Sequence, residues 1–384
     1  MTELSLTSRV CFGKDAVAAL SEFKGNNVVI VTDPFFAKTK KTDVLIERMP
    51  GSDVAVYSDI APDPTIDQVR ETFKFVKKHN ADVIVAFGGG SAIDTAKAVI
   101  LVAREDPDFT QKLKLVAIPT TSGTGSEVTS FTVISDPETC RKYPLVDDDI
   151  LPSLAVLDYT FTMTVPPSVT AATGMDVLTH AIEAYVSVNA NHISDAFAEK
   201  AVSLIYEYLY KAYKDGNNEA AREGMQAASY LAGISFNTAG LGITHSIAHA
   251  LGANFHIPHG LANAMVLSHV IEYNACMDIA FGADKCVAAK RYAKIAELLG
   301  LGRVGTRLAC QKLAQEMRVA LDLMKIPKTL VQAGVKPEQY KACRQAMIDS
   351  ALADVCTATN PRQPTAEDIG KILDKLYGGK MLAW

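Results

Sequence analysis

Carboxylate and imidazole side chains recur at short spacings between residues 173 and 260, and they are the first candidates for chemistry. Asp176 and His180 are four residues apart, His245 and His249 repeat that spacing, and His259 lies between a proline and a glycine. Four-residue spacing puts two side chains on one helix face, and the proline-glycine context predicts a tight turn. Oxygen and nitrogen donors without a cysteine favour a first-row divalent metal. Single histidines usually pack in cores, but this grouping favours a metal site.

The composition indicates a globular protein that does not bind nucleic acid. The 384 residues are 48% hydrophobic and 21% charged, and the net charge is −5. Lys and Arg are scattered, so no basic face would attract nucleic acid or anionic lipid. No apolar run approaches the length of a bilayer span. The seven cysteines form no C-x-x-C pair, which is typical of buried free thiols. Because the first residues also show no signal-peptide pattern, we expect a cytoplasmic protein.

The order of apolar runs predicts two domains. As far as residue 163, short β-branched runs alternate with helical stretches, which is the pattern of an α/β sheet. Beyond the break at Pro166 and Pro167, helical periodicity dominates. We therefore expect an α/β domain at 1–163 and an all-α domain at 164–384. The expected strands are Val28–Thr32, Val54–Tyr57, Asp82–Phe87, Leu115–Ile118, Phe131–Ile134 and Leu154–Leu157.

A glycine-rich segment between a strand and a helix predicts a phosphate-binding loop. Gly88, Gly89, Gly90 and Ser91 follow an apolar strand directly. Glycines let the backbone approach a pyrophosphate, and the following helix N-terminus offers free N–H groups. Ser91 and Asp94 have capping-box spacing, which predicts that the helix starts just after the loop. The segment is not a G-x-G-x-x-G motif, and a simple tight turn is the structural alternative.

Two further strand ends carry side chains suited to a dinucleotide. Thr120, Thr121 and Thr124 belong to a loop rich in hydroxyls and glycine that follows a strand. Such a loop can donate hydrogen bonds to phosphate or ribose, although it can also be an ordinary turn. Asp33 ends another strand, where a carboxylate can accept from the adenosine ribose hydroxyls and repel a 2′-phosphate. This residue therefore favours NAD over NADP.

Several motifs resemble those of the iron-dependent (group III) alcohol dehydrogenases over essentially the full length. The resemblance implies a Rossmann-like dinucleotide-binding domain followed by an all-α metal-binding domain of the dehydroquinate synthase-like type. Finer features at residues 61–65, 135–137 and 142–144 look most like the propanol and ethanol dehydrogenases of bacterial propanediol and ethanolamine microcompartments. The motifs are Gly88-Gly-Gly-Ser-Ala-Ile-Asp-Thr-Ala-Lys97, Pro119-Thr-Thr-Ser-Gly-Thr-Gly-Ser-Glu-Val128, Ala172-Thr-Gly-Met-Asp-Val-Leu-Thr-His-Ala-Ile-Glu183, the spaced His245, His249 and His259, and Asn360-Pro-Arg362.

The resemblance also implies roles for individual residues. His249 matches a family histidine beside the nicotinamide, where it is a candidate proton shuttle. Asp63 departs from the asparagine that many members carry, which puts one ribose contact in doubt. The implied metal ligands are Asp176, His180, His245 and His259. The implied cofactor-binding residues are Asp33, Gly88, Gly89, Gly90, Ser91, Asp94, Thr120, Thr121, Thr124, Val133 and Lys142.

We therefore expect an NAD- and iron-dependent alcohol dehydrogenase acting on short aldehydes such as propanal or acetaldehyde. Zinc is a possible substitute, because an Asp/His₃ site binds zinc more tightly than ferrous iron. The alternatives are a glycerol or diol dehydrogenase, a non-redox enzyme similar to dehydroquinate synthase, and a structural protein stapled by a metal. A homodimer or larger homo-oligomer, with possible microcompartment shell or enzyme partners, is also expected.

Overall fold

The computed structural model describes residues 8–137 and 141–378, without the side chains of 141 and 142. Contacts within the chain define two compact units. The segment 216–233, which the predicted boundary near residue 163 assigned to the second domain, belongs to the first unit because it packs there as part of helix α7 (Glu219–Ala239). The units are Met1–Val165 with Gly216–Gly233, and Pro166–Asp215 with Ile234–Trp384.

The first unit is built on a six-stranded sheet in which every pair of neighbouring strands is parallel. The strand order is β1-β8-β5-β4-β2-β3, so the sequence direction reverses between β2 and β4. The strand expected at 131–134 instead forms a separate antiparallel hairpin of β6 (Phe131–Asp136) and β7 (Arg141–Val146). The sheet strands are β1 (Arg9–Phe12), β2 (Asn27–Thr32), β3 (Asp53–Tyr57), β4 (Val83–Gly88), β5 (Lys114–Pro119) and β8 (Leu154–Leu157).

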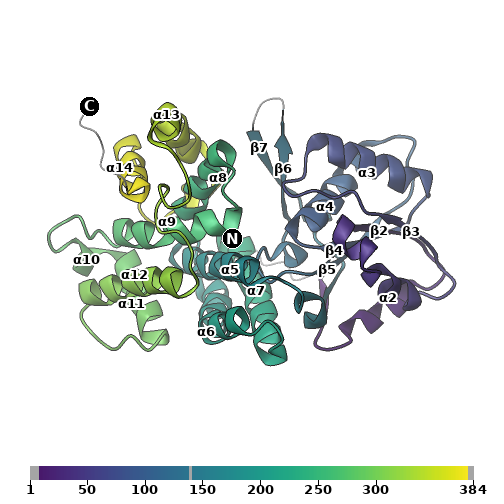
Figure 1. The fold of residues 1–384 in the computed structure, drawn as a ribbon, viewed down its shortest axis with the longest axis horizontal. Coiled ribbons are helices and arrows are strands. Elements are labelled where there is room, and N and C mark those ends of the chain that lie inside the picture. Colours follow the sequence, from purple (N-terminus) through teal and green to yellow (C-terminus); the bar gives the residue numbers. More distant parts are fainter. Residues whose placement is uncertain (1–7, 138–140, 379–384) are drawn as a thin grey trace. The chain divides into compact units, whose positions relative to one another are not determined.

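Both faces of this sheet are buried, which explains why its strands are continuous apolar runs. Val29 and Ile84 face a core formed with α3 (Ile66–Lys78) and α4 (Gly90–Glu105). Their neighbours Val28 and Val85 face the opposite core, because successive side chains in a strand alternate. In Figure 1, α3 and α4 cover one face of the strands and α2 covers the other. That second face is covered by η1 (Ala16–Phe23), α1 (Pro34–Lys38), α2 (Lys41–Glu47) and η4 (Tyr159–Thr162).

The helices α3 and α4 of the first unit begin in different ways. Thr65 caps α3, since its hydroxyl accepts from the N–H of Gln68 at 3.2 Å. The predicted cap by Ser91 is wrong, because α4 already begins at Gly90, with Gly89 as its N-cap. The Asp94 carboxylate is instead directed at a neighbouring loop. Gly89 and Gly90 thus form the helix N-terminus itself, and Gly88 ends the preceding strand.

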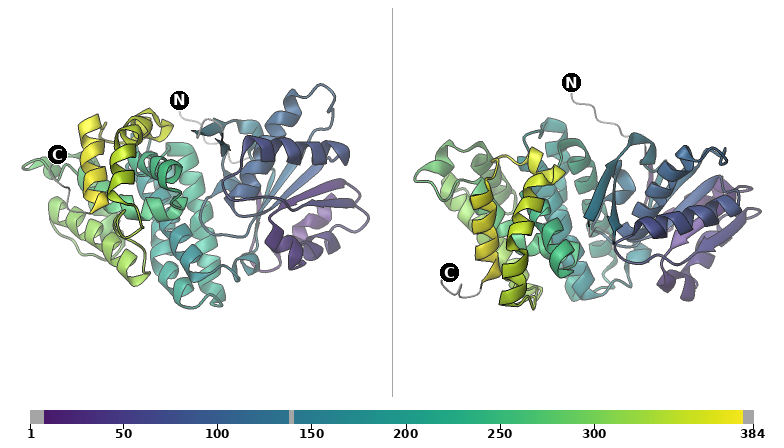
Figure 2. Two further views of the ribbon diagram at one scale, coloured as in Figure 1. Left: turned by 45° about the horizontal axis from the view of Figure 1, so that its top comes forward. Right: turned by 90° about the horizontal axis from the view of Figure 1, so that it is seen from above.

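The second unit is entirely helical in its described residues. Its yellow C-terminal helices, α13 and α14, lie side by side (Figure 2). Tyr340 and Arg344 of α13 join Asp374 of α14 through hydrogen bonds of 2.6 to 2.8 Å. Its elements, besides part of α7, are α5 (Pro167–Val186), α6 (His192–Lys214), α8 (Ile243–Phe255), α9 (His259–Asn274), α10 (Gly282–Lys285), α11 (Val287–Leu298), α12 (Thr306–Leu323), α13 (Pro337–Ala353), η5 (Val355–Thr359) and α14 (Ala366–Tyr377).

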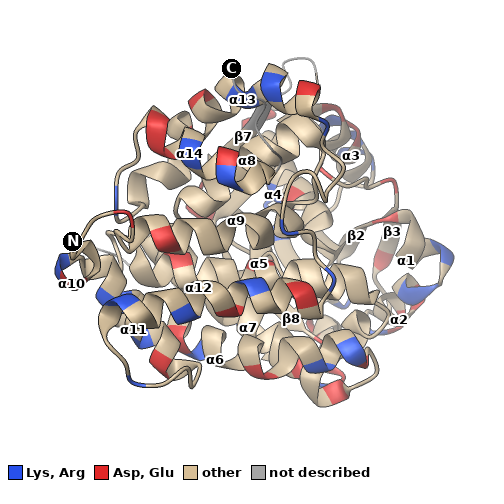
Figure 3. Cartoon of the chain, turned by 60° about the vertical axis from the view of Figure 1, so that its left-hand side comes forward, with Lys and Arg blue, Asp and Glu red and all other residues tan. Residues whose placement is uncertain are grey.

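The surface carries interspersed charge of both signs, as the blue and red segments along α11 and α12 show (Figure 3). None of the helices in the described ranges has the length and hydropathy of a membrane span.

Six cysteines fall within the described ranges, and all are free thiols. The expectation that they are buried is wrong for most of them. Only Cys310 and Cys356 are buried, whereas Cys140 lies outside the described residues.

Candidate metal centre and nucleotide-binding edge

Three neighbouring strands end at one edge of the sheet and bring most of the predicted nucleotide-binding residues together. Asp33 directly follows β2, Gly88 ends β4, and Thr120 follows β5. The backbone N–H of Thr120 donates to the carbonyl of Gly88 at 3.0 Å. In open parallel sheets, ligands bind outside the carboxyl ends of the strands, where the strand order reverses. That point here lies between β2 and β4.

The two predicted loops pack on each other closely enough to require glycine at residue 90, whereas Gly89 leaves room for an ordinary contact. A Cβ on Gly90 would lie 2.7 Å from Cγ2 of Thr124, and one on Gly89 would lie 3.5 Å from Oγ1 of Thr121. A Cβ on Gly88 would lie 2.7 Å from that of Ala92 in α4. The first turn of α4 therefore presents bare backbone N–H groups, which suits a pyrophosphate.

A buried polar group behind these loops received no role in the sequence analysis. Lys97 of α4 donates from Nζ to the carbonyls of Thr129 and Phe131 at 2.7 and 2.8 Å, and to the Thr129 hydroxyl at 3.1 Å. Burial lowers the pKa of Lys97 to about 8, and burial raises the pKa of Glu127 to about 7. Three oxygen acceptors match the three protons of an ammonium. Lys97 thus fixes the start of the hairpin against α4.

The remaining predicted cofactor residues have different surroundings. Asp94 accepts a hydrogen bond from the Ser126 hydroxyl at 2.7 Å, so it braces the second loop rather than capping its own helix. Val133 is half-buried on β6, opposite Pro144. Lys142 lies on β7, but its side chain is outside the described residues. Asp63 adopts a φ of 55°, a conformation that both asparagine and aspartate tolerate.

In the second unit, four predicted ligands converge from three helices. Asp176 and His180 come from α5, His245 from α8 and His259 from α9, and their ligand atoms all lie within 4.8 Å of one another. Asp176 Oδ1 is 3.9 Å from His245 Nε2 and 3.6 Å from His259 Nε2. The predicted turn at His259 is wrong, because this residue is the first of helix α9.

Close helix packing explains the glycine after His259. A Cβ on Gly260 would lie 2.4 Å from the carbonyl oxygen of Ala172, so a larger residue would force α9 away from α5. The amide of Asn263, one turn further along, donates to Asp176 Oδ1 at 2.7 Å. Backbone contact and one hydrogen bond together hold the N-terminus of α9 against the carboxylate.

The electrostatics of this cluster suit a divalent cation. Asp176, His180 and His245 are each at least 96% buried. Burial lowers the pKa of His180 to about 3 and that of His245 well below its usual range, so both imidazoles are neutral and can coordinate through a lone pair. Within the described chain, Nδ1 of His180 and Nε2 of His245 are buried without a hydrogen-bond partner. Buried polar atoms without partners are costly, and a metal ion would satisfy the His245 nitrogen.

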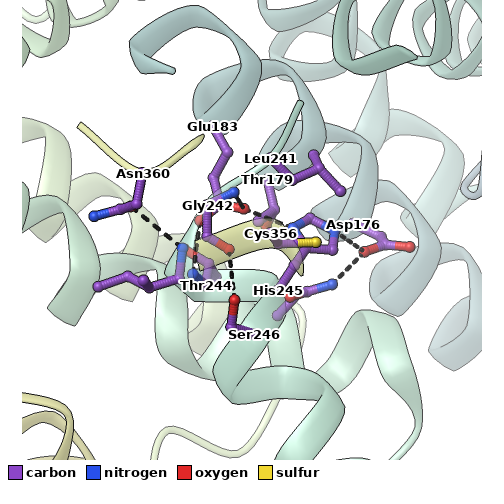
Figure 4. A network of polar contacts seen from close by, with 12 residues as sticks. Asp176, Thr179, Glu183, Leu241, Gly242, Thr244, His245, Ser246, Cys356 and Asn360 are labelled. Carbon is purple, nitrogen blue, oxygen red and sulfur yellow. Dashed lines mark hydrogen bonds and ion pairs between the residues drawn. The ribbon is translucent and has the colours of Figure 1, made fainter. Parts of the chain in front are cut away.

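A buried carboxylate, Glu183, orients His245 and was missed as a site residue. Its Oε2 accepts from Nδ1 of His245 at 2.6 Å and from the N–H of Gly242 at 3.0 Å. Its Oε1 accepts from the N–H of Thr244 at 2.7 Å (Figure 4). A hydrogen bond at one ring nitrogen directs the other nitrogen toward a metal. A sequence signal existed, because Glu183 stands seven residues after Asp176, two turns along the same helix face.

His249 makes a similar pair with Asp354, which lies 105 residues away in the chain. Nδ1 of His249 is 2.8 Å from Asp354 Oδ2, and its ring stacks on that of His259 with centroids 5.3 Å apart. Burial alone would raise the pKa of Asp354, but hydrogen bonds with His249 and Cys356 outweigh it and lower the pKa to about 2. Asp354 is therefore ionised, and Nδ1 of His249 carries the donated proton. No local spacing reveals this partner.

Comparisons with known proteins match the chain to one family. A model of iron-containing alcohol dehydrogenases matches residues 7–159, and a model of the C-terminal part of the Fe-containing alcohol dehydrogenase family matches residues 170–377. A 1-propanol dehydrogenase of Salmonella typhimurium is 41% identical, with 98% of this chain and all of that protein covered.

Solved structures show the same fold over 98% of this chain. A 1,3-propanediol oxidoreductase has a TM-score of 0.89 at 34% identity, and all of that chain is covered. A sulfoacetaldehyde reductase from Bifidobacterium kashiwanohense, solved in complex with NAD⁺, has a TM-score of 0.84 at 27% identity, with 99% of that chain covered. The predicted combination of an α/β domain and an all-α domain is confirmed.

Proposed function

This chain belongs to the iron-containing alcohol dehydrogenase family, and we propose that it uses NADH and ferrous iron to interconvert short-chain aldehydes and primary alcohols, with propanal as the preferred aldehyde. The family match confirms the resemblance seen in the motifs and the alcohol dehydrogenase activity expected from it. The buried Asp/His₃ cluster is the observation that carries the proposal, because its neutral imidazoles and carboxylate suit a divalent ion. The 1-propanol dehydrogenase relative supports the substrate.

The site residues of the second unit each have a definite task in this proposal. Asp176, His180, His245 and His259 hold the ion. When bound, iron supplies Lewis-acid polarisation of a carbonyl and the reduced nicotinamide supplies hydride. His249, whose Nδ1–H is held by ionised Asp354, keeps Nε2 as the nitrogen that can accept or release a proton.

In the first unit, the nucleotide would be held by backbone more than by side chains. The N–H groups at the start of α4 are suited to the pyrophosphate. The Asp33 carboxylate is suited to the adenosine ribose, with one oxygen already committed to capping α1. Thr121 and Thr124 pack directly on the glycines and close the loop from the β5 side.

The test is anaerobic NADH oxidation with propanal after chelator-treated protein has been reconstituted with ferrous iron or zinc in parallel. We expect turnover with iron and less with zinc. Tight NADH binding without turnover on any aldehyde would refute the proposal. Turnover with 3-hydroxypropanal at a higher kcat/KM than with propanal would favour the diol dehydrogenase alternative, which the structural likeness to 1,3-propanediol oxidoreductase supports.

Assembly and location are part of the same proposal. We infer a homodimer or larger homo-oligomer that works inside the cell, with partners in a propanediol-type microcompartment. Support comes from the 1-propanol dehydrogenase relative. Sedimentation of the purified protein tests the first inference, and a monomer at micromolar concentration would refute it. Copurification with isolated microcompartments tests the second.

A further inference from the structure

The N-terminus of α8, which carries His245, is held by side chains from two distant segments. Four N–H groups at the start of a helix lack partners within the helix. Gly242 and Thr244 donate theirs to Glu183 at 3.0 and 2.7 Å. The N–H of Ile243, between them, donates to Oδ1 of Asn360 at 3.2 Å. Three consecutive donors are therefore satisfied by the side chains of Glu183 and Asn360. Asn360 belongs to the Asn360-Pro-Arg362 motif, which has no role in the catalytic proposal.

The Asn360 amide uses its full hydrogen-bonding capacity. Besides accepting from Ile243, Oδ1 accepts from the amide of Asn274 at 3.0 Å. Its Nδ2 donates to Oδ1 of Asn274 at 2.8 Å and to the carbonyl of Arg362 at 2.6 Å. Asn274 and Asn360 are both at least 99% buried. Because every donor and acceptor is committed, the amide has one orientation, and that orientation presents an acceptor to α8.

The start of α8 packs closely against the side chains of Asn360 and Glu183. A Cβ on Gly242 would lie 2.8 Å from Oδ1 of Asn360 and 2.8 Å from Oε1 of Glu183. Both side chains therefore touch the backbone of residue 242 directly, as Figure 4 shows for the same residues. His245 lies three residues further along, and its Nδ1–H donates to the same Glu183 carboxylate. A displaced Asn360 would move the helix start, and with it both the imidazole and its orienting carboxylate.

We propose that Asn360, locked by its reciprocal amide pair with Asn274, is a positioning residue that sets the place of His245 in the metal centre. It contacts no ligand side chain and acts through the backbone of α8. Arg362 secures the motif from the other side, since its guanidinium donates to the carbonyl of Tyr273 at 2.8 Å, next to Asn274. This inference rests on the proposed metal site.

The test is Co²⁺ binding to metal-free protein, followed by visible absorption and competition with a chelator. Asn360→Ala is expected to weaken Co²⁺ affinity about tenfold, the lower end of the range for groups that orient metal ligands, and to shift the visible bands. Asn360→Asp keeps the acceptor for the Ile243 N–H and adds a charge that a helix N-terminus favours. It should bind Co²⁺ more tightly than Asn360→Ala.

A control variant on the same helix separates positioning from general loss of stability. Asn254 lies near the end of α8 and donates only to the carbonyl of Ala250 at 2.8 Å. Asn254→Ala should leave Co²⁺ affinity and spectrum unchanged. If Asn360→Ala lowers the free energy of unfolding but binds Co²⁺ as the wild type does, Asn360 is merely structural and the inference is wrong.

Two further outcomes are decisive. Should Asn360→Ala fail to fold, Asn274→Ala replaces it, because it breaks the amide pair without removing the acceptor. Asn274→Ala is expected to weaken Co²⁺ binding less but in the same direction, and unchanged binding would overturn the inference. Absence of Co²⁺ binding by the wild type would instead refute the metal site itself, and with it the role of Asn360.

Discussion

We expect coenzyme choice to depend on the Asp33 carboxylate, whose two oxygens have different surroundings. Oδ1 caps α1, accepting from the N–H groups of Phe35 and Phe36 at 2.8 and 3.3 Å. Oδ2 faces the glycine loop, 3.9 Å from the position that a Cβ on Gly88 would occupy. Replacing Asp33 by Asn keeps the cap and removes the charge, whereas Asp33→Gly removes both. The pair of variants therefore separates electrostatics from capping.

The magnitudes differ enough to be measured. A phosphate about 4 Å from a carboxylate is repelled by about 4 kcal/mol per unit charge at an effective dielectric constant of about 20. Because Asp33 is half-exposed, screening reduces this repulsion to about 1.5–3 kcal/mol. Removing it should raise kcat/KM for NADPH about 10- to 100-fold. Loss of a hydrogen bond from the ribose to a charged acceptor weakens the binding of NADH by about 1.5 kcal/mol or more. Glycine at an N-cap costs only a few tenths of a kcal/mol.

The assay is kcat/KM for NADPH and NADH, with the melting temperature as a control for folding. We expect both variants to raise the NADPH to NADH ratio about 100-fold or more, and Asp33→Gly to melt slightly lower than Asp33→Asn. An unchanged ratio in both variants would show that the carboxylate does not face the ribose. A changed ratio in Asp33→Gly alone would mean that the geometry of the cap, rather than charge, controls selectivity.

Four other substitutions test the remaining parts of the two sites. His259→Ala and Asp176→Ala should each lose most bound metal and activity, and either variant with normal metal content and turnover would refute the ligand assignment. Asp354→Asn should lower kcat about 10- to 100-fold with metal content unchanged, because His249 loses its orienting acceptor. The pKa of Asp354 is depressed to about 2, so the ionised carboxylate contributes its full stabilisation above pH ~4. In urea unfolding, the difference in free energy of unfolding between the wild type and Asp354→Asn should therefore shrink as the pH falls from 4 toward 2. Lys97→Met should cost about 3–5 kcal/mol in the same assay, since buried partners lose their cation; a cost below about 1 kcal/mol would contradict the ammonium assignment.

Much of the framework can be predicted because it depends on local sequence. The alternation of Val28 and Val29 between two cores follows from the period of a strand. The i, i+4 pair of Asp176 and His180 follows from the period of a helix. The start of α4 was misplaced because a serine with an acid three residues on is also the signature of a cap. Here tertiary packing against Thr124 favoured a start at Gly90 instead.

The orienting groups could not be predicted equally well. Glu183 shares a helix face with Asp176, so its position could have been found from spacing alone. Asp354 reaches His249 only because η5 returns to α8 after about a hundred residues, and spacing along the chain contains no sign of it. His259 was placed in a turn because proline and glycine flank it. The close approach of α9 to α5, which demands that glycine, is a property of two helices together.

The buried Lys97 has a practical consequence for following the motions of the first unit. It is the one lysine in the buried class among the residues with described side chains. Its amine can meet an acylating reagent only when α4 and the start of the hairpin separate, because three oxygens enclose it. The rate at which this single amine is labelled in the native protein therefore reports how often α4 and the start of the hairpin separate. Slower labelling with NADH present would measure how strongly the bound coenzyme suppresses this local opening.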